Sequence, residues 1–322
     1  MVVDELPLSR AAVDRAAELR GRADLVAGAL ADERTRVLLL RDGLTAVDDE
    51  GVALLLLSPA QLRDVRAIDP AVAATGDDDG WVFLGRDDEG THYLALHGPA
   101  PAEGQTPPTG QDGGVRFASL RVLGALLSAR DAGLATTAVA LAAWHANHRH
   151  CPRCGSPTRV TQAGWSRTCV QDGSEHYPRT DPAVIMAVVD DDDRLLLGHA
   201  VAWPAGRYST LAGFVESGES LEHAVRREVL EETRVAVGEV EYRGSQPWPF
   251  PASLMLGFRA RALSVEVTAD GEEMGDARWF TRAELAEAVR DGSVVPPGRS
   301  SIARALIEEW FGGALPTDDW TA

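Results

Sequence analysis

The sequence contains no lysine, so all 31 of its basic residues are arginine. This absence excludes Schiff-base catalysis and phosphate loops that depend on a lysine. The 49 acidic residues outnumber the basic ones and give a formal net charge of −18. Because nonspecific nucleic-acid binding relies on basic surface that displaces counterions, no broad RNA- or DNA-binding face is expected. A polyphosphate substrate would need metal ions to offset repulsion by this chain.

Long apolar runs are also missing. No run reaches the roughly 18 residues of a membrane span, and the acidic N-terminal segment lacks the apolar stretch of a secretory signal. We therefore expect a cytoplasmic protein without a membrane-spanning helix. At 322 residues, 45% hydrophobic and 25% charged, the chain suits two globular domains and a small module. The predicted division is an α+β domain over 1–146, a zinc-ribbon-like module over 147–180 and an α/β domain over 181–316.

The apolar runs that do occur are short and are separated by Gly, Pro and Asp, which is typical of strands. In the first domain the expected strands are Val37–Leu40, Val52–Leu57, Trp81–Leu84 and Tyr93–Leu96, followed by a Pro/Gly-rich loop at Pro99–Gly114 and two helices within Phe117–His148 that break near Gly133. In the last domain we expect a hairpin of Ala183–Val189 and Arg194–His199, a strand at Ser253–Ala262 and a helix at Ser300–Phe311. No repeat is evident, although the strand-rich first domain could be a degenerate relative of the last.

Three glutamates lie close together in the segment REVLEE. Glu228, Glu231 and Glu232 are spaced i, i+3, i+4, so on a helix they project from one face with Cβ atoms about 5–6 Å apart. Three like charges at this distance repel one another, whereas a divalent cation such as Mg²⁺ or Mn²⁺ prefers such an oxygen-rich shell. A solvated acidic face is the alternative for an isolated glutamate pair.

All three cysteines, Cys151, Cys154 and Cys169, fall in one short segment. A CxxC followed by glycine is half of a zinc ribbon, in which thiolates hold Zn²⁺. The second half has Asp172 where another cysteine would stand, so the predicted ligands are the three thiolates and Asp172, with His176 as another possible fourth ligand. His145, His148 and His150 are nearer the first pair but are expected to be structural or exposed. A ribbon that has lost its metal and persists by packing is the alternative.

The segment QPWPFPASLM alternates prolines with large residues after the glutamate cluster. Prolines stiffen a loop without internal hydrogen bonds, so its aromatic faces can be held out for stacking on a planar base. Taken alone, such a loop more often serves packing.

The ordered set Gly213, Glu219, Arg227-Glu228 and Glu231-Glu232 resembles the Nudix box. One position departs, because Arg234 stands where the family has its second glycine, a left-handed helix cap. Together with SQPWPFPxS and the ribbon-like segment, the chain from about Trp144 to Arg304 is similar to the NADH pyrophosphatase family of Nudix hydrolases.

The resemblance implies an N-terminal domain, a zinc ribbon and a catalytic α/β/α sandwich, assembled as a homodimer. It also implies hydrolysis of the pyrophosphate of NADH to NMNH and AMP, weaker action on NAD⁺ and, in some bacteria, removal of NAD caps from RNA 5′ ends. By the same matching, Glu228, Glu232 and Glu273 would bind the catalytic Mg²⁺ or Mn²⁺. Glu231 would act as a ligand or general base, and Arg227 would orient the glutamates while water attacks phosphorus.

The residues that the resemblance assigns to dinucleotide binding are Tyr177, Phe214, Gln246, Pro247, Trp248, Pro249, Phe250, Pro251, Ala252, Ser253 and Ala303. Three functions compete. A pyrophosphatase specific for NADH is favoured, an enzyme that mainly removes NAD caps from RNA shares its chemistry, and a non-catalytic zinc-ribbon module with a vestigial Nudix fold is the third. The third predicts damaged carboxylates, yet all of them are present.

Overall fold

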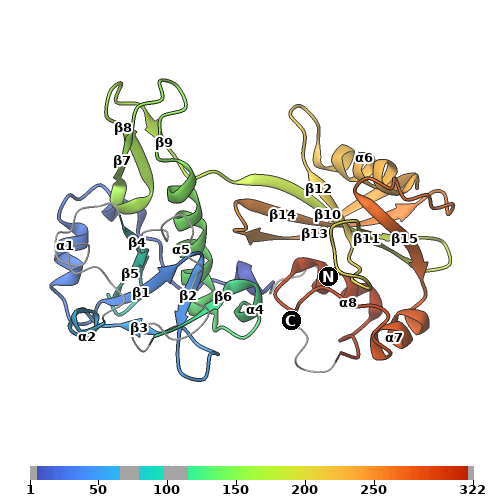
Figure 1. The fold of residues 1–322 in the computed structure, drawn as a ribbon, viewed down its shortest axis with the longest axis horizontal. Coiled ribbons are helices and arrows are strands. Elements are labelled where there is room, and N and C mark those ends of the chain that lie inside the picture. The colour runs from blue at the N-terminus through green and yellow to red at the C-terminus, as the bar shows by residue number, and fades with distance from the viewer. Residues whose placement is uncertain (1–5, 66–79, 98–114, 318–322) are drawn as a thin grey trace. The chain divides into compact units, whose positions relative to one another are not determined.

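The computed structural model describes residues 6–65, 80–97 and 115–317, which form two compact units (Figure 1). Within the described ranges, one unit comprises residues 6–9, 181–247 and 253–317, and the other comprises residues 10–180 and 248–252. The short segment 248–252 therefore groups with the earlier part of the chain. The loop predicted at Pro99–Gly114 lies outside the described residues. Among the described helices, none is long and apolar enough to cross a membrane.

The unit formed mainly by the later residues contains a mixed six-stranded sheet. Its strands are β10 (Asp181–Val189), β11 (Leu195–Ala200), β12 (Leu211–Phe214), β13 (Val237–Trp248), β14 (Ser253–Ala262) and β15 (Met274–Phe280). They follow the order β13-β14-β10-β11-β15, with β12 also paired to β10. Strand β10 runs parallel to β14 and antiparallel to β11 and β12. The predicted hairpin and the strand at Ser253–Ala262 are confirmed.

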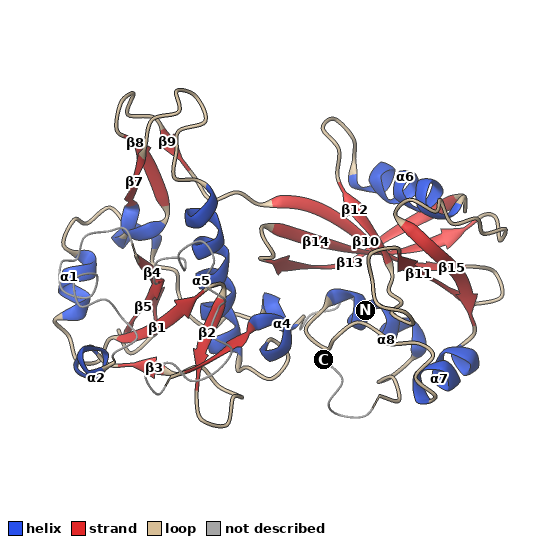
Figure 2. Ribbon diagram, in the orientation of Figure 1, coloured by secondary structure: helices blue, strands red, loops and turns tan. Residues whose placement is uncertain are grey.

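Helices cover both faces of this sheet, as Figure 2 shows. They are α6 (Leu221–Thr233), α7 (Arg282–Arg290) and α8 (Ile302–Phe311). Alternate residues of β10 enter opposite cores: Val184, Met186 and Val188 pack with residues of α6, whereas Ile185, Ala187 and Val189 pack with residues of α7 and α8. Because successive side chains of a strand point to opposite faces, β10 is apolar along its whole length. The expected α/β/α sandwich is confirmed.

The other unit contains a second mixed sheet of six strands. These are β1 (Arg36–Arg41), β2 (Leu44–Val47), β3 (Leu56–Leu57), β4 (Trp81–Arg86), β5 (His92–His97) and β6 (Arg116–Ser119), in the order β4-β5-β1-β2-β6 with β3 paired to β1. Its helices are α1 (Leu25–Leu30), α2 (Pro59–Asp64), α4 (Leu120–Leu123) and α5 (Ala129–Asn147). Taken in chain order, β1 to β6 occupy the same places as β10 to β15. The two sheets thus share one topology, as expected if the first domain is a degenerate relative of the last.

The predictions for this unit were wrong in three details. The expected strand over Val52–Leu57 is reduced to Leu56–Leu57, and strands β2 and β6 were not predicted. The two helices expected within Phe117–His148 are present as α4 and α5, but the break lies between Leu123 and Ala129 rather than near Gly133, through which α5 runs. Gly133 instead allows a close approach, since a Cβ there would lie 3.0 Å from the carbonyl oxygen of Arg10.

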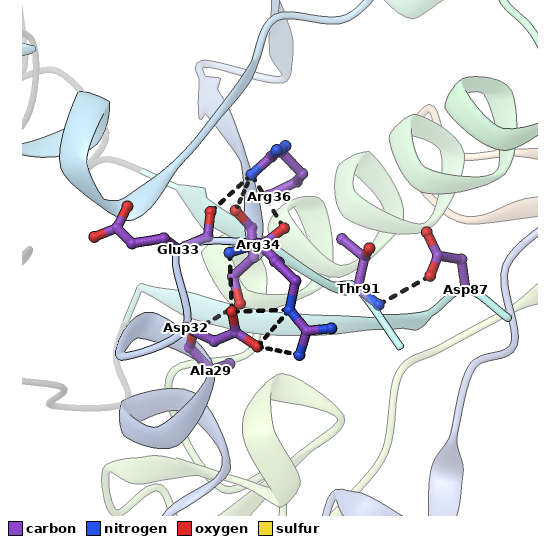
Figure 3. Close-up of polar contacts among 8 residues, drawn as sticks. Ala29, Asp32, Glu33, Arg34, Arg36, Asp87 and Thr91 are labelled. Carbon is purple, nitrogen blue, oxygen red and sulfur yellow. Dashed lines mark hydrogen bonds and ion pairs between the residues drawn. The ribbon is translucent and has the colours of Figure 1, made fainter. Parts of the chain in front are cut away.

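The turn between α1 and β1 is held by local polar contacts (Figure 3). The carboxylate of Asp32 accepts a hydrogen bond from the backbone N–H of Arg34 at 2.9 Å and forms an ion pair with the Arg34 guanidinium at 2.7 Å. The Arg36 guanidinium donates to the carbonyl oxygens of Glu33 and Arg34, both at 3.0 Å. Such Asx contacts are the usual way in which aspartate stabilises a turn.

The cysteine segment contains a three-stranded sheet of β7 (Thr158–Thr161), β8 (Ser166–Cys169) and β9 (Glu175–His176), with Cys169 at the end of β8 and Cys151 and Cys154 before β7. Its strand β8 is joined to α5 through His145, whose Nδ1 accepts from the Arg167 guanidinium at 3.0 Å while Nε2 donates to the carbonyl oxygen of Gly164 at 2.9 Å. Burial lowers the pKa of His145 to about 4, so the ring is neutral near pH 7. His145 is therefore structural, as expected.

Gly28 and Gly133 allow a matched test of the close approach between α5 and the backbone of Arg10. Both lie inside helices, where alanine is favoured over glycine by about 0.5–1 kcal/mol. A Cβ at Gly28 would meet nothing within 4 Å, whereas one at Gly133 would press on the Arg10 backbone. We expect Gly28→Ala to raise the Tm of this unit and Gly133→Ala to leave it unchanged or lower it, as measured by calorimetry. An equal rise in both variants would contradict the close approach.

Candidate active site

The glutamate cluster lies on α6, which follows β12 across a short loop. The Ser220 side chain caps the helix by accepting a hydrogen bond from the His223 N–H at 3.3 Å. Glu228 and Glu232 are buried against the sheet, whereas Glu231 is exposed. Helical spacing thus places the three carboxylates next to one another on one face of α6. Two of them are buried and the third is in contact with solvent.

Gly213 on β12 makes the approach of Glu228 possible. A Cβ at this position would lie only 1.9 Å from the carboxyl carbon of Glu228. No side chain could occupy that space without displacing the carboxylate. The first glycine of the motif therefore serves contact with the helix that follows rather than a special backbone angle.

Arg227 connects the carboxylates to one another. Its guanidinium donates to Glu219, to Glu228 Oε1 at 2.8 Å and to Glu231 Oε2 at 3.1 Å. The same group donates to the backbone carbonyl of Phe214 at 2.9 Å, which ties the helix to the end of β12. These charge-assisted bonds fix the direction in which Glu219, Glu228 and Glu231 point.

The negative charge of Glu232 is not offset by Arg227. Its side chain is 4% exposed, and Oε2 has no hydrogen-bond partner within the described structure. Burial, together with the charges of Glu228 and Glu273, raises the pKa of Glu232 to about 8, and burial also raises the pKa of Glu228. A buried carboxylate is costly unless a cation or donor offsets its charge. The orphaned oxygen among several carboxylates fits a divalent cation, which would supply that charge.

Glu273 comes from a different part of the chain, the loop that leads into β15. It is exposed, and its charge is among those that raise the pKa of Glu232. Two backbone contacts place this loop beside the end of α6: the Asp270 N–H donates to the Glu232 carbonyl oxygen at 3.2 Å, and the Thr268 N–H donates to that of Thr233 at 2.9 Å. The structure thus brings together the three residues predicted to bind the catalytic metal.

The predicted zinc ligands also lie together. One ligand atom from each of Cys151, Cys154, Cys169 and Asp172 falls within a group whose members are all within 4.8 Å of one another. Asp172 Oδ2 lies 4.0 Å from the Cys151 sulfur, while Oδ1 accepts from the N–H and hydroxyl of Ser174 at 2.9 and 2.6 Å. These Ser174 bonds lower the pKa of Asp172 to about 2, so the carboxylate stays ionised. Three thiols and one ionised carboxylate form a donor set suited to zinc.

The aromatic residues of the Pro-rich loop contact each other and an arginine. The rings of Trp248 and Phe250 meet edge to face with centroids 5.0 Å apart. The Arg121 guanidinium lies over Phe250, 4.1 Å from the ring centroid, and 5.2 Å from that of Trp248. A cavity of about 380 Å³ next to Pro249 and Phe250 is lined mainly by apolar residues. Arg121 was not predicted to have a role, and no motif in the sequence marks it.

The other predicted dinucleotide-binding residues have varied surroundings. Tyr177 and Phe214 are 64% and 59% exposed, respectively. Ala303 is buried at the start of α8. Gln246 is fully buried and donates to the Ser300 carbonyl oxygen at 2.9 Å, while its Oε1 has no partner within the described residues. Tyr177 and Trp248–Ala252 belong to the unit of the first sheet, whereas Phe214, Gln246, Pro247, Ser253 and Ala303 belong to the other.

Comparison with known families agrees with this arrangement. Residues 179–297 match the NUDIX domain, residues 146–177 match the NADH pyrophosphatase zinc ribbon domain, and residues 34–144 match the NADH pyrophosphatase-like rudimentary NUDIX domain. The NAD-capped RNA hydrolase NudC of Mycobacterium bovis (strain BCG / Pasteur 1173P2) is 42% identical over 238 residues, which are 71% of this chain and 74% of that protein. The chain belongs to the NADH pyrophosphatase family of Nudix hydrolases. The rudimentary domain confirms that the first sheet is a degenerate relative of the last.

For longer relatives, the match covers a smaller share of both this chain and the relative. The human NAD-capped RNA hydrolase NUDT12 is 42% identical over 198 residues, which are 58% of this chain and 43% of that protein. The chain thus spans less than half of the length of that relative. A crystal structure of a NUDIX hydrolase from Nitrosomonas europaea covers 52% of this chain and 94% of its own, at 22% identity and a TM-score of 0.40, a likeness too weak to add to the assignment.

Arg234, the departure from the Nudix box, ends α6 in the position of the missing glycine. It adopts a left-handed conformation with φ 63° and ψ 8°, and its N–H donates to the Leu230 carbonyl oxygen at 3.0 Å. Arg234 thus adopts the left-handed backbone conformation that a glycine would adopt here, and the helix ends at the same position.

The strain at Arg234 predicts a gain from glycine. A left-handed residue with a Cβ costs roughly 1–2 kcal/mol relative to glycine. We expect Arg234→Gly to be more stable than Arg234→Ala by about 1 kcal/mol, as measured by chemical denaturation of the metal-free protein. The alanine variant is the control, because it removes the same side chain but keeps the Cβ. Equal stability of the two variants would show that position 234 is not strained.

Proposed function

We propose that this protein hydrolyses the pyrophosphate of NADH, and of NAD⁺ less well, to NMNH or NMN and AMP, in a reaction that depends on a divalent metal ion. The observation that supports it best is the buried Glu232 carboxylate, which lacks a partner at Oε2 and lies among like charges. Such a group is stable as an anion only beside a cation. Membership of the NADH pyrophosphatase family supports the choice of a dinucleotide substrate.

Glu228, Glu232 and Glu273 would hold Mg²⁺ or Mn²⁺. When bound, the metal neutralises charge that develops on the phosphoryl oxygens and lowers the pKa of water. Arg227 keeps Glu228 directed toward the site through its 2.8 Å bond. Glu231 is exposed and bonded to Arg227, so it can contribute as a ligand or as the base that takes a proton from the attacking water.

In this proposal, the dinucleotide is bound by Tyr177, Phe214, Ala303 and the loop from Gln246 to Ser253. Phe214 and Tyr177 have the exposed rings that stacking on a base requires. Gln246 contributes differently, because its buried amide bonds to Ser300 and anchors the start of the loop. A homodimer with three modules per chain, bounded at 1–146, 147–180 and 181–316, and a cytoplasmic location complete the proposal.

A second candidate, removal of NAD caps from RNA 5′ ends, uses the same chemistry. It is favoured by the names of the relatives from Mycobacterium bovis and human, both NAD-capped RNA hydrolases. The net charge of −18 disfavours long RNA contacts but permits recognition of the terminal cap. Comparing kcat/KM for NADH, NAD⁺ and an NAD-capped oligonucleotide at one salt concentration would rank the two.

The primary experiment is chromatography of the products formed from NADH with Mg²⁺ or Mn²⁺. We expect NMNH and AMP from the wild-type protein, and a fall in kcat by orders of magnitude in Glu232→Gln with the fold retained by circular dichroism. Glu222→Gln is a matched control, since Glu222 lies on the first turn of α6, away from the cluster. Near-normal turnover by Glu232→Gln would contradict the assignment, and absence of cleavage by the wild type would favour a non-catalytic module.

We further propose that Cys151, Cys154, Cys169 and Asp172 hold a structural zinc ion, with His176 as the alternative fourth ligand. The Ser174 hydroxyl lies 3.2 Å from His176 Nε2 and 2.6 Å from Asp172, so it links the two candidates. Asp172 is favoured because its Oδ2 faces the thiols.

Elemental analysis of gently purified protein tests this zinc site. We expect about one zinc per chain. Asp172→Ala should release zinc to a chromogenic chelator at least about tenfold faster than the wild type, because loss of a ligand opens the closed site. His176→Ala should release it at nearly the wild-type rate. A ratio near zero in the wild type would show that the ribbon persists without metal, and the reverse ranking of the two variants would assign the fourth ligand to His176.

A further inference from the structure

The loop that carries Glu273 has no regular secondary structure, yet it must present a carboxylate to a site built on α6. Strand β14 ends at Ala262, and β15 begins at Met274. Glu273 therefore depends on contacts of the intervening loop for its position. Its backbone carbonyl accepts from the Val201 N–H at 2.9 Å, which holds one side of the residue.

Asp270 supplies the contacts on the other side. A single oxygen, Oδ1, accepts backbone N–H groups of Glu272, Glu273 and Met274 at 2.9, 3.0 and 2.9 Å. The loop turns sharply between these residues, with Gly271 at φ 76° and its N–H bonded to the Met274 carbonyl oxygen at 2.9 Å. Three bonds to one carboxylate oxygen fix the backbone from which the Glu273 side chain projects.

Asp270 also joins this loop to the helix. Its own N–H donates to the carbonyl oxygen of Glu232, so the residue that shapes the loop is bonded to a metal-binding candidate of α6. One residue thus joins the two segments that carry the proposed metal ligands. From this geometry we propose that Asp270 is a positioning residue, which holds Glu273 beside Glu228 and Glu232 through hydrogen bonds accepted by Oδ1.

This inference rests on the proposed metal site but adds a residue to which no metal or substrate contact is assigned. Outer residues that orient metal ligands typically contribute 10–100-fold to metal affinity. Because the role lies in hydrogen-bond acceptance, an asparagine at this position can fulfil it, whereas an alanine cannot.

The test is Mn²⁺ binding to the zinc-loaded protein, measured by electron paramagnetic resonance of the free ion. We expect Asp270→Ala to weaken binding at least about tenfold, approaching the effect of Glu273→Gln, and Asp270→Asn to stay within about threefold of the wild type. Glu272→Ala is the matched control: it removes an exposed negative charge from the same loop and should bind as the wild type does. The Tm of each metal-free variant shows whether the fold is kept.

Kinetics provide a second measurement. With NADH as substrate, Asp270→Ala should need more Mn²⁺ for half-maximal rate but recover much of kcat at saturation, whereas Glu232→Gln should not recover.

The outcomes separate this inference from the proposed function. Absence of Mn²⁺ binding by the wild type, or an unaltered affinity in Glu232→Gln, contradicts the metal site itself. Weak binding by Glu273→Gln with wild-type affinity in Asp270→Ala overturns only the positioning role. If Asp270→Asn binds as weakly as Asp270→Ala, the charge of Asp270 matters rather than its hydrogen bonds, and the positioning role is likewise overturned.

Discussion

The constraint on which the active-site region depends is electrostatic: several carboxylates lie close together, and their mutual repulsion must be offset. Glu228 and Glu232 are both buried on one side of α6, and Glu273 approaches from another loop. Arg227 offsets part of this charge by bonding to Glu219, Glu228 and Glu231, but it does not reach Glu232. At Glu232 one carboxyl oxygen, Oε2, meets no donor among the described residues. This concentration of buried carboxylates is local to α6 and its neighbouring loop, and it is the feature on which the proposed cation site rests.

The two sheets show that this demand is separable from the fold. Both have six strands in the same order, and in both a helix follows the third strand. In the later sheet that helix is α6, with thirteen residues and the glutamate cluster. In the earlier sheet it is α2, with six residues, no glutamate and a capping box that begins at Ser58. The topology thus forms without the glutamates, and in both sheets the equivalent strands β1 and β10 are apolar and buried. The glutamate cluster is thus found on α6 and not on its counterpart α2, so the shared topology alone does not supply the site.

Much of the site could be predicted from the sequence because its information is local. Helical periodicity places Glu228, Glu231 and Glu232 on one face, and ligand chemistry marks the Cys151-to-Cys169 segment. The roles of the glutamates, including Glu273 in a separate loop, came from the resemblance to the Nudix box. Contacts between distant segments could not be predicted in this way. In the sequence Gly133 suggests a helix break, but in the structure it allows the backbone of Arg10 to lie close to α5. Nothing in the sequence indicates that Arg121 stacks on Phe250. The short strands β2 and β6 were missed since four residues carry too little periodicity to stand out from a turn or a helix.

The two departures from the family pattern, Arg234 and Asp172, have a common explanation in the roles that their positions serve. At position 234 the structure requires a left-handed residue, and an arginine can adopt that conformation at a modest cost. At position 172 the carboxylate lies near the three thiols, with its other oxygen held by Ser174, as the proposed zinc site needs. Gly213 shows the opposite limit: a Cβ there would overlap the carboxyl group of Glu228, so no substitution could preserve the arrangement. A motif position is therefore strict where another side chain occupies its space and permissive where only a backbone angle or a charge is needed.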